Sequence, residues 1–292
     1  MISAPLTKKI IQSFDALSGQ LQSAARFVLD HPHDVALKSM RDQARAANVK
    51  PATMTRLAQH LGFQGYEEIR ELYATAIRKG ELGYAGKVGV QAARQRTQGD
   101  KALSSEMAHL IAQQVASLGE PAFVDRMVAA AKCIAAADHV YCLGLRSCHT
   151  VAWYMAYILS LIGCRSTVLD GAAAIGFDPI VHAKAKDVLV VNSIKPYARQ
   201  TIEIAQYAAS RKVAIVAITD SEVAPIARLA KHVIVVGTES PSFFHAMSPS
   251  FAVAEILNAL VAGQRGASSL NALRKTDERL ETFRVFLKSS RQ

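Results

Sequence analysis

Apolar residues recur at helical spacing through the first 80 residues of the chain. Leu6, Ile10 and Phe14 follow one another at intervals of four, which places them on one face of a helix. A second pattern begins near Ser18 and must end before Pro32, because proline disfavours a helical conformation in the preceding residue. Further helical patterns cover residues 40–47, 51–61 and 64–79. Residues 1–80 are therefore predicted to form an all-α bundle.

The helical pattern stops after this bundle and then resumes. The segment KGELGYAGKVGVQAARQRTQG, residues 79–99, contains five glycines and shows no helical period. Residues 81–103 are therefore predicted to be a linker. Near Ser104 the helical spacing of apolar residues returns, which predicts a connecting helix over residues 104–127.

The pattern changes class near residue 138. Five short runs are rich in valine and isoleucine: HVYCLG, STVLD, DVLVVNS, VAIVAI and HVIVVG. They alternate with helical patterns at residues 148–162, 198–209, 222–230 and 249–262. Such alternation is typical of a parallel sheet covered on both faces. Residues 128–268 are therefore predicted to form an α/β doubly wound domain with a five-stranded parallel sheet, and residues 269–292 an amphipathic C-terminal helix.

The charge of the chain is unevenly distributed. The chain has 34 Lys and Arg against 24 Asp and Glu, a net charge of +10. Residues 1–96 hold 14 of the basic and 8 of the acidic residues, and so carry more than half of this excess. A basic domain favours polyanionic partners such as nucleic acid, although a basic surface also serves solubility alone.

Two observations predict a cytoplasmic protein. The N-terminus MISAPLTKKI has no apolar stretch after its positive charges, so no signal peptide is expected. The longest nearly uncharged apolar run, Thr150–Cys164, is shorter than the ~20 residues that span a bilayer. The four cysteines show no C-x-x-C spacing and are expected to be reduced thiols. Cys148 differs from the others in lying in a loop.

Residues 40–61 show the pattern of two short helices joined by a tight turn. Ala44 supplies the small side chain that closely crossing helices need, and Asn48 tolerates a positive φ angle in the turn. Met54 and Leu57 are expected to face inward. The residues expected to be exposed near the start of the second helix are Lys50, Thr53, Thr55, Arg56 and Gln59.

These five residues are the candidate DNA-binding set. In a DNA-binding helix-turn-helix, the N-terminal part of the second helix enters the major groove. Lys50 is then expected to meet a phosphate, and Arg56 or Gln59 to reach base edges. The alternative is a plain helical bundle with a solvated basic face.

The stretch VYCLGLRSCHTVAWYM, residues 140–155, predicts a strand that runs through a turn into a helix. Only Gly144 of the three glycines of a dinucleotide fingerprint is present, so NAD is not expected. The turn offers backbone N–H groups, the Ser147 hydroxyl and a helix N-terminus, which suit an isolated phosphate, and Arg146 can clamp it. The alternative is that Ser147 caps the helix and Arg146 is a surface cation.

A second candidate loop follows the strand DVLVVNS. It supplies Ser193, Lys195, Tyr197 and Thr201 between the carboxyl end of that strand and the next helix. Ligands of doubly wound sheets bind at these ends, where the strand order reverses. If the first and third strands are neighbours, this loop and the loop at residues 144–149 face each other.

Two segments carry a family resemblance. VKPATMTRLAQHLGFQGYEEIREL resembles the helix-turn-helix of RpiR-type bacterial transcriptional regulators over residues 5–79, with Lys50 in place of the usual serine and Asn48 in place of the usual glycine. Residues 128–263 resemble the sugar isomerase (SIS) domain that binds phosphosugars. That resemblance implies that Ser147, Ser193 and Thr201 bind the phosphate, with Lys195 where the family often has a second serine. Thr219-Asp220-Ser221 resembles a third loop of the family, or caps a helix at residues 222–230.

The resemblance implies a regulator of a carbohydrate-metabolism operon, without cofactor, metal or catalytic residues. A homodimer or homotetramer would bind a palindromic operator in double-stranded DNA, and a phosphorylated sugar or sugar acid would control that binding. Two alternatives stay open: a SIS-type sugar-phosphate isomerase or amino-sugar lyase, and a dimerisation scaffold with a vestigial pocket. The candidate bases for an isomerase are His149, Glu222, Glu239, His245 and Glu255.

Overall fold

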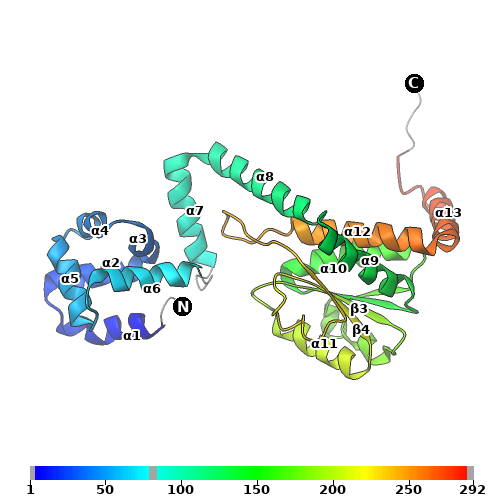
Figure 1. Ribbon diagram of the computed structural model, residues 1–292, viewed down its shortest axis with the longest axis horizontal. Helices are drawn as coiled ribbons and strands as arrows, with labels where there is room; N and C mark the ends of the chain where they lie inside the picture. Colours follow the sequence, from blue (N-terminus) through cyan, green and yellow to red (C-terminus); the bar gives the residue numbers. More distant parts are fainter. Residues whose placement is uncertain (1–3, 79–83, 288–292) are drawn as a thin grey trace. The chain divides into compact units, whose positions relative to one another are not determined.

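The structure is a computed structural model that describes residues 4–78 and 84–287 (Figure 1). The chain divides into two compact units. The N-terminal unit contains the residues up to Met107 together with Ser240–Phe244, and the C-terminal unit contains Ala108–Glu239 and the residues from His245 onward.

The N-terminal unit is all helical, as the apolar spacing predicts. Its first helices are α1 (Ala4–Ser13), α2 (Gly19–Asp30), α3 (Pro32–Leu37), α4 (Met40–Ala46), α5 (Pro51–His60) and α6 (Tyr66–Arg78), with a 3-10 turn at Phe14–Ala16. The core formed by these helices includes Leu6, Ile10, Ala25, Val28, Met54, Leu57 and Ile69. The short helix α3 was not predicted, because the sequence pattern ends at His31 and six residues are too few to show a period.

Two predictions for the region between the bundle and the sheet are wrong. The predicted linker contains the helix α7 (Tyr84–Gln98), and Gly99, with φ 83°, separates it from α8 (Asp100–Ser117). Gly86 and Gly89 each cost about 1 kcal/mol relative to alanine, but the glycine-free second half consists mostly of strong helix formers. The predicted connecting helix over 104–127 is interrupted before Pro121, where α9 (Pro121–Ala135) begins.

The C-terminal unit contains the predicted five-stranded parallel sheet. Its strands are β1 (Val140–Leu143), β2 (Ser166–Leu169), β3 (Val188–Ser193), β4 (Ala214–Thr219) and β5 (His232–Val235). Their order is β2-β1-β3-β4-β5, and every neighbouring pair is parallel. All six residues of β3 are buried, as expected for a central strand covered on both faces. Because β1 lies beside both β2 and β3, the strand order reverses between β1 and β3.

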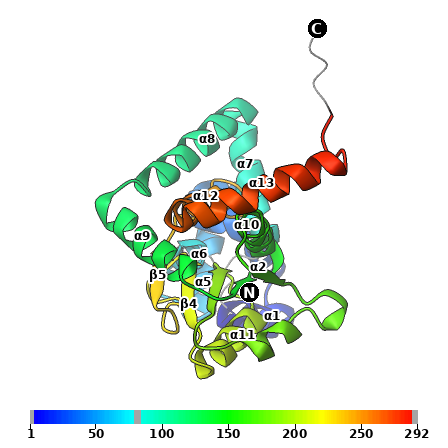
Figure 2. The same cartoon turned by 90° about the vertical axis from the view of Figure 1, so that its right-hand side faces the viewer.

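Helices cover both faces of this sheet. The helices α9, α10 (His149–Leu161) and α12 (Ser248–Arg265) pack on one face through residues such as Met155 and Leu257. The helix α11 (Arg199–Ser210) packs on the other face through Ala205 and Ala208. Figure 2 shows α10 and α12 on one side of the strands and α11 on the other.

Two C-terminal expectations need correction. Residues 222–229 form turns and not the predicted helix, since Pro225 falls within the short segment and Ala224 and Ile226 are buried against the sheet. The C-terminal helix α13 covers Ala267–Thr282, and the last five residues of the predicted 269–292 helix lie outside the described residues. Within the described part of the chain, no helix combines the length and apolar character that a membrane crossing requires.

Candidate DNA and effector sites

The helix-turn-helix forms as the sequence predicts. The turn between α4 and α5 contains Asn48 with φ 53°. It is closed by a hydrogen bond from the Val49 N–H to the Ala44 carbonyl oxygen at 2.9 Å. Ala44, Met54 and Leu57 are all buried in the core of the N-terminal unit. The first and second helices of the motif are therefore α4 and α5.

The five predicted DNA-binding residues do not share one environment. Lys50, Arg56 and Gln59 are exposed, as predicted. Thr53 is only 3% exposed, so its predicted exposure is wrong. It lies one helical turn before Leu57 and therefore shares the buried face of α5. Thr55 is partly buried, and its hydroxyl donates to the Met40 sulfur at 3.8 Å.

The surface of the motif is positively charged. Besides Lys50 and Arg56, the exposed side chains of Arg41 and Arg45 lie on α4. Asp42 pairs with Arg45 at 3.5 Å, and both side chains are largely exposed, so this pair neutralises little of the field. In a bound helix-turn-helix the first helix crosses the DNA backbone. Sequence reasoning missed these two arginines, although their charge and spacing on the first helix were a usable signal.

Gln43 holds the first helix of the motif in place. Its side chain is fully buried, and its amide donates to the carbonyl oxygens of Val35 at 3.1 Å and Lys38 at 2.8 Å. The Tyr66 hydroxyl donates to the Gln43 Oε1 at 2.7 Å. Burial raises the pKa of Tyr66, which keeps this hydroxyl a donor. One buried side chain thus joins the end of α3, α4 and α6.

The loop after β1 contains two unusual backbone positions, Gly144 and Arg146. A Cβ atom on Gly144 would lie 2.7 Å from the carbonyl carbon of Cys148, so the turn leaves room only for glycine. Arg146 has φ 57°, in the left-handed region that L-residues rarely adopt. The chain then passes through a 3-10 turn over Arg146–Cys148 into α10. The two positions direct the chain sharply from the strand to the helix.

Hydrogen bonds join the loops that follow β1, β3 and β5, and they also join the last residues of β3 and β4. The Ser147 Oγ lies 3.1 Å from the His245 Nε2, and the backbone N–H of Ile194 donates to the Cys148 sulfur. The Thr219 hydroxyl donates to the carbonyl oxygen of Ser193 at 2.7 Å. The loop at 144–149 and the loop that begins at Ser193 therefore meet, at the point where the strand order reverses.

The six predicted effector residues differ in their exposure. Ser193 and Thr201 are buried and Ser147 is partly buried. Arg146 and Lys195 are exposed, and Tyr197 is partly buried. The structure therefore brings Ser147 and Ser193 into adjoining loops, whereas Thr201 lies in the first turn of α11.

Two ionisable groups at the meeting point have shifted pKa values. Burial and a hydrogen bond to Asp220 raise the pKa of Tyr197 to about 12, so its hydroxyl donates to that carboxylate at neutral pH. Burial also raises the pKa of the Cys148 thiol. A thiolate is the reactive form of cysteine, so Cys148 is suited to a structural role.

Sequence reasoning missed Asn192 and Ser250. Asn192 is buried in β3, and the Ser250 hydroxyl donates to its Oδ1 at 3.5 Å. The Asn192 Nδ2 has no hydrogen-bond partner among the residues that the structure describes. An amide directly after the apolar run VLVV, within the same predicted strand, was the available signal.

The five candidate bases lie in different parts of the C-terminal unit. His245 contacts Ser147, as described above, and His149 begins α10. The Gln114 side chain donates to the Glu239 carboxylate at 3.1 Å. Glu255 is exposed on α12. Among the described residues, no group of three or more His, Cys, Asp or Glu side chains could hold a metal ion.

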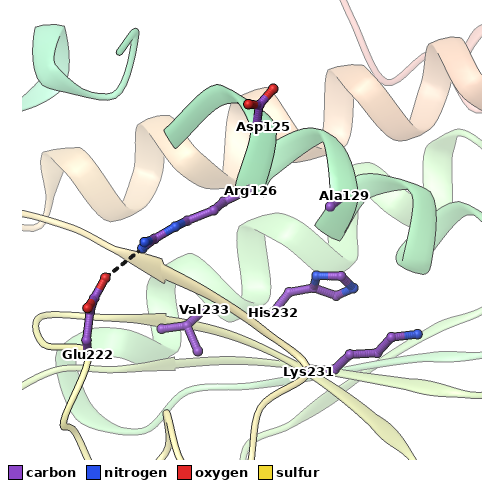
Figure 3. A pocket seen from close by; sticks show the side chains of 7 residues that line it. All are labelled: Asp125, Arg126, Ala129, Glu222, Lys231, His232 and Val233. Atoms are coloured by element: carbon purple, nitrogen blue, oxygen red, sulfur yellow. Dashed lines mark hydrogen bonds and ion pairs between the residues drawn. The ribbon is translucent and has the colours of Figure 1, made fainter. Parts of the chain in front are cut away.

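Glu222, the fifth candidate, lines a separate hollow of about 490 Å³ beside the edge strand β5 (Figure 3). The hollow is lined by Asp125, Arg126, Ala129, Glu222, Lys231, His232 and Val233. Arg126 and Glu222 form an ion pair at 2.9 Å. Burial and the nearby Lys231 lower the pKa of His232. This lining carries charges of both signs and contains none of the predicted effector residues. The hollow is therefore distinct from the meeting point of the loops.

Comparisons with known proteins match both units. The model of the rpiR-family helix-turn-helix domain matches residues 5–79, and the model of the SIS domain matches residues 133–260. The sugar isomerase domain of an RpiR transcription factor from Sphaerobacter thermophilus is 27% identical, with a TM-score of 0.53; the match covers 63% of this chain and 99% of that one. The Vibrio vulnificus NanR protein, solved with ManNAc-6P, is 20% identical with a TM-score of 0.54, over 95% of this chain and 98% of that one. No curated protein sequence matches significantly.

Proposed function

The chain belongs to the RpiR-type family of bacterial transcriptional regulators, with an N-terminal helix-turn-helix domain and a C-terminal SIS domain, and we propose that a phosphorylated sugar or sugar acid bound in the SIS domain controls its affinity for operator DNA. It acts in the cytoplasm, as a homodimer or homotetramer on a palindromic operator. Two-fold symmetric pairs of helix-turn-helix domains read half-sites that are one or more helical turns apart.

One observation supports this function above the others. Loops after β1 and β3 meet where the strand order reverses, and Ser147 and Ser193 each directly precede the residues, Cys148 and Ile194, whose hydrogen bond joins the two loops. Hydroxyls and backbone N–H groups at a helix N-terminus suit a phosphate, and Arg146 supplies positive charge at the rim. The exposed Lys50, Arg56 and Gln59 of the same chain supply the DNA-binding surface.

A second candidate function rests on His245. Its imidazole lies 3.1 Å from the hydroxyl of Ser147, a predicted phosphate ligand, and histidine is the most common general base in enzymes. The chain would then isomerise its ligand, and DNA binding would be a separate property. Turnover distinguishes the two functions, because a sensor returns its ligand unchanged.

A thermal-shift screen of the full-length protein tests the proposal. The panel contains phosphorylated sugars and sugar acids, ManNAc-6P among them, with their unphosphorylated counterparts and inorganic phosphate. A ligand present at 100 times its Kd stabilises the protein by about 2.7 kcal/mol. We expect a hit that depends on the phosphate, and we expect the same compound to change the affinity for duplex DNA selected by the protein from a random pool.

Ser193→Ala completes the test, with Ser160→Ala on the exposed side of α10 as its matched control. Ser193→Ala should bind the selected DNA normally and lose the response to the hit, whereas Ser160→Ala should keep both. An unchanged response in Ser193→Ala would contradict the site. If NMR shows that the protein converts the hit compound, the isomerase function is favoured. If no compound of the panel binds, the loops at residues 144–149 and 193–201 act only as helix caps.

A further inference from the structure

One loop of the C-terminal half of the chain belongs to the N-terminal unit. Ser240–Phe244 groups with that unit, whereas the residues on both sides of it group with the other. The loop is closed at its base by a hydrogen bond from the Ala246 N–H to the Thr238 carbonyl oxygen at 3.1 Å. The chain therefore leaves the C-terminal unit after Glu239 and returns to it at His245.

Within the N-terminal unit this segment contacts α7. The ring of Phe244 stacks on Tyr84, with centroids 5.4 Å apart and an interplanar angle of 21°. The Phe243 backbone N–H donates to the Gln91 Oε1 at 3.0 Å. Phe243 and Phe244 also pack edge to face, with centroids 6.0 Å apart. Two turns of α7 are thus contacted by adjacent residues of the loop.

Within the C-terminal unit both ends of the loop are held by side chains. On the first side, the Gln114 amide donates to the Glu239 carbonyl oxygen at 3.0 Å, and Gly237 packs so closely on Gln114 that a Cβ would lie 2.9 Å from its Cγ. On the returning side, the His245 Nε2 lies 3.1 Å from the Ser147 Oγ. One end of the loop is therefore fixed to α8, and the other is bonded to a predicted phosphate ligand.

We propose that His245 is a positioning residue through which occupancy of the phosphate site acts on α7. This inference rests on the proposed function, since it takes Ser147 to be a phosphate ligand. In the imidazole tautomer whose Nε2 carries no proton, the Ser147 hydroxyl donates to that nitrogen. A phosphate oxygen that accepts the Ser147 proton breaks this hydrogen bond, so the His245 Nε2 loses Ser147 as its donor. Because His245 directly follows Phe244, a change in its position is passed along the backbone to the residues that contact Tyr84 and Gln91.

The geometry limits how far His245 can move without moving Phe244. One peptide bond separates His245 from Phe244, and consecutive Cα atoms lie a fixed 3.8 Å apart. The hydrogen bond between Ala246 and Thr238 restrains the residue that follows His245, so a shift of His245 is less easily taken up on the side of α12. Motion at the phosphate site is then expressed in the loop, at its contacts with α7.

Hydrogen exchange of the full-length protein tests the inference, with inorganic phosphate as the probe and chloride at the same ionic strength as the control. In the wild type, phosphate should slow exchange in residues 144–149. It should also change exchange in α7 by about fivefold, the lower end of common allosteric couplings. If the loop has only a structural role, it affects the exchange rate of α7 in the absence of phosphate but not the change in that rate that phosphate causes.

Three variants separate transmission from binding. Phe244→Ala should keep the protection of residues 144–149 and lose the response of α7. His245→Ala should also lose that response, and His245→Gln, which keeps a hydrogen-bonding group, should restore part of it. Phe283→Ala is the matched control, because Phe283 is 72% exposed at the end of α13 and should behave as the wild type.

The outcomes distinguish this inference from the proposed function. If phosphate leaves residues 144–149 of the wild type unprotected, the phosphate site is wrong and both proposals fail. If residues 144–149 are protected but α7 does not respond, or if α7 responds equally in Phe244→Ala, the inference fails alone and the proposed function stands. Phe244→Ala keeps the test decisive even if His245→Ala does not fold.

Discussion

Asn48 and Arg146 are two L-residues with positive φ angles, and each lies in one of the two candidate sites. A left-handed conformation costs such residues roughly 1–2 kcal/mol, and asparagine reduces this cost because its side chain hydrogen-bonds locally. Arginine has no such compensation. The surrounding structure must therefore hold Arg146 in place, as often happens where backbone strain accompanies a binding site.

Asn48→Ala should lower the free energy of unfolding of the N-terminal unit by about 1 kcal/mol, because alanine adopts the left-handed conformation less readily than asparagine does. Asn48→Gly should stay close to the wild type, since glycine adopts a positive φ without a Cβ clash. Urea denaturation followed by far-UV circular dichroism measures both. The fluorescence of Trp153, the one tryptophan of the sequence, reports the C-terminal unit separately. An equal loss in both variants would contradict this account.

At the scale of elements, α5 combines a buried face with an exposed, charged start. Met54, Leu57 and Ala58 pack into the core, while Lys50 precedes the helix without a side-chain cap. A serine at this position would cap the helix and contribute roughly 1 kcal/mol. The charge of Lys50 thus takes the place of a stabilising cap at the end of the helix that points toward DNA in this motif.

Arg56→Ala and Lys50→Ala should weaken DNA binding in different ways. A lost base contact costs about 1–3 kcal/mol and relaxes specificity, so Arg56→Ala should reduce the ratio of its affinities for selected and random duplexes by about 5–150-fold. A lost phosphate contact acts on all sequences, so Lys50→Ala should weaken both and reduce the salt slope by about one ion. Fluorescence anisotropy at several salt concentrations measures both effects.

Arg211→Ala, a matched control with the same change of charge, lies in an exposed position after α11 in the C-terminal unit. It should leave both the specificity and the salt slope intact. Specific binding by Arg56→Ala at the wild-type level would show that another element reads the bases.

At the scale of the whole molecule, the chain joins two units with separate cores, one basic and helical, the other built on a parallel sheet. Each unit can bind its own partner, so regulation requires that the two binding equilibria share a free energy of coupling. Such a coupling is reciprocal by thermodynamic necessity.

If the phosphosugar hit changes the affinity for the selected duplex by some factor, the duplex should change the affinity for the phosphosugar by the same factor, commonly 5–150-fold. Isothermal titration of the phosphosugar, with and without saturating duplex, measures the second factor, and anisotropy measures the first. In Ser193→Ala both factors should fall to one. Two unequal factors in the wild type would show that the titrations follow different equilibria, such as a change of oligomeric state.

The sequence by itself determined the class of most elements. Valine-rich runs predicted all five strands, because strands buried on both faces are apolar throughout and this composition is visible locally. Asn48 and Pro51 marked the turn and the start of α5 for a similar reason, since both act through their own backbone angles. The loops at Ser147 and Ser193 were located because they follow directly from predicted strands.

Only the tertiary structure decided which of these residues meet. Thr53 is polar but lies on the buried face of α5, because packing against other elements outweighs local preference. Ser147 and His245 are 98 positions apart, and Asn192 and Ser250 are 58 apart. No local pattern encodes such pairs, since each depends on the strand order and on the path of the intervening chain.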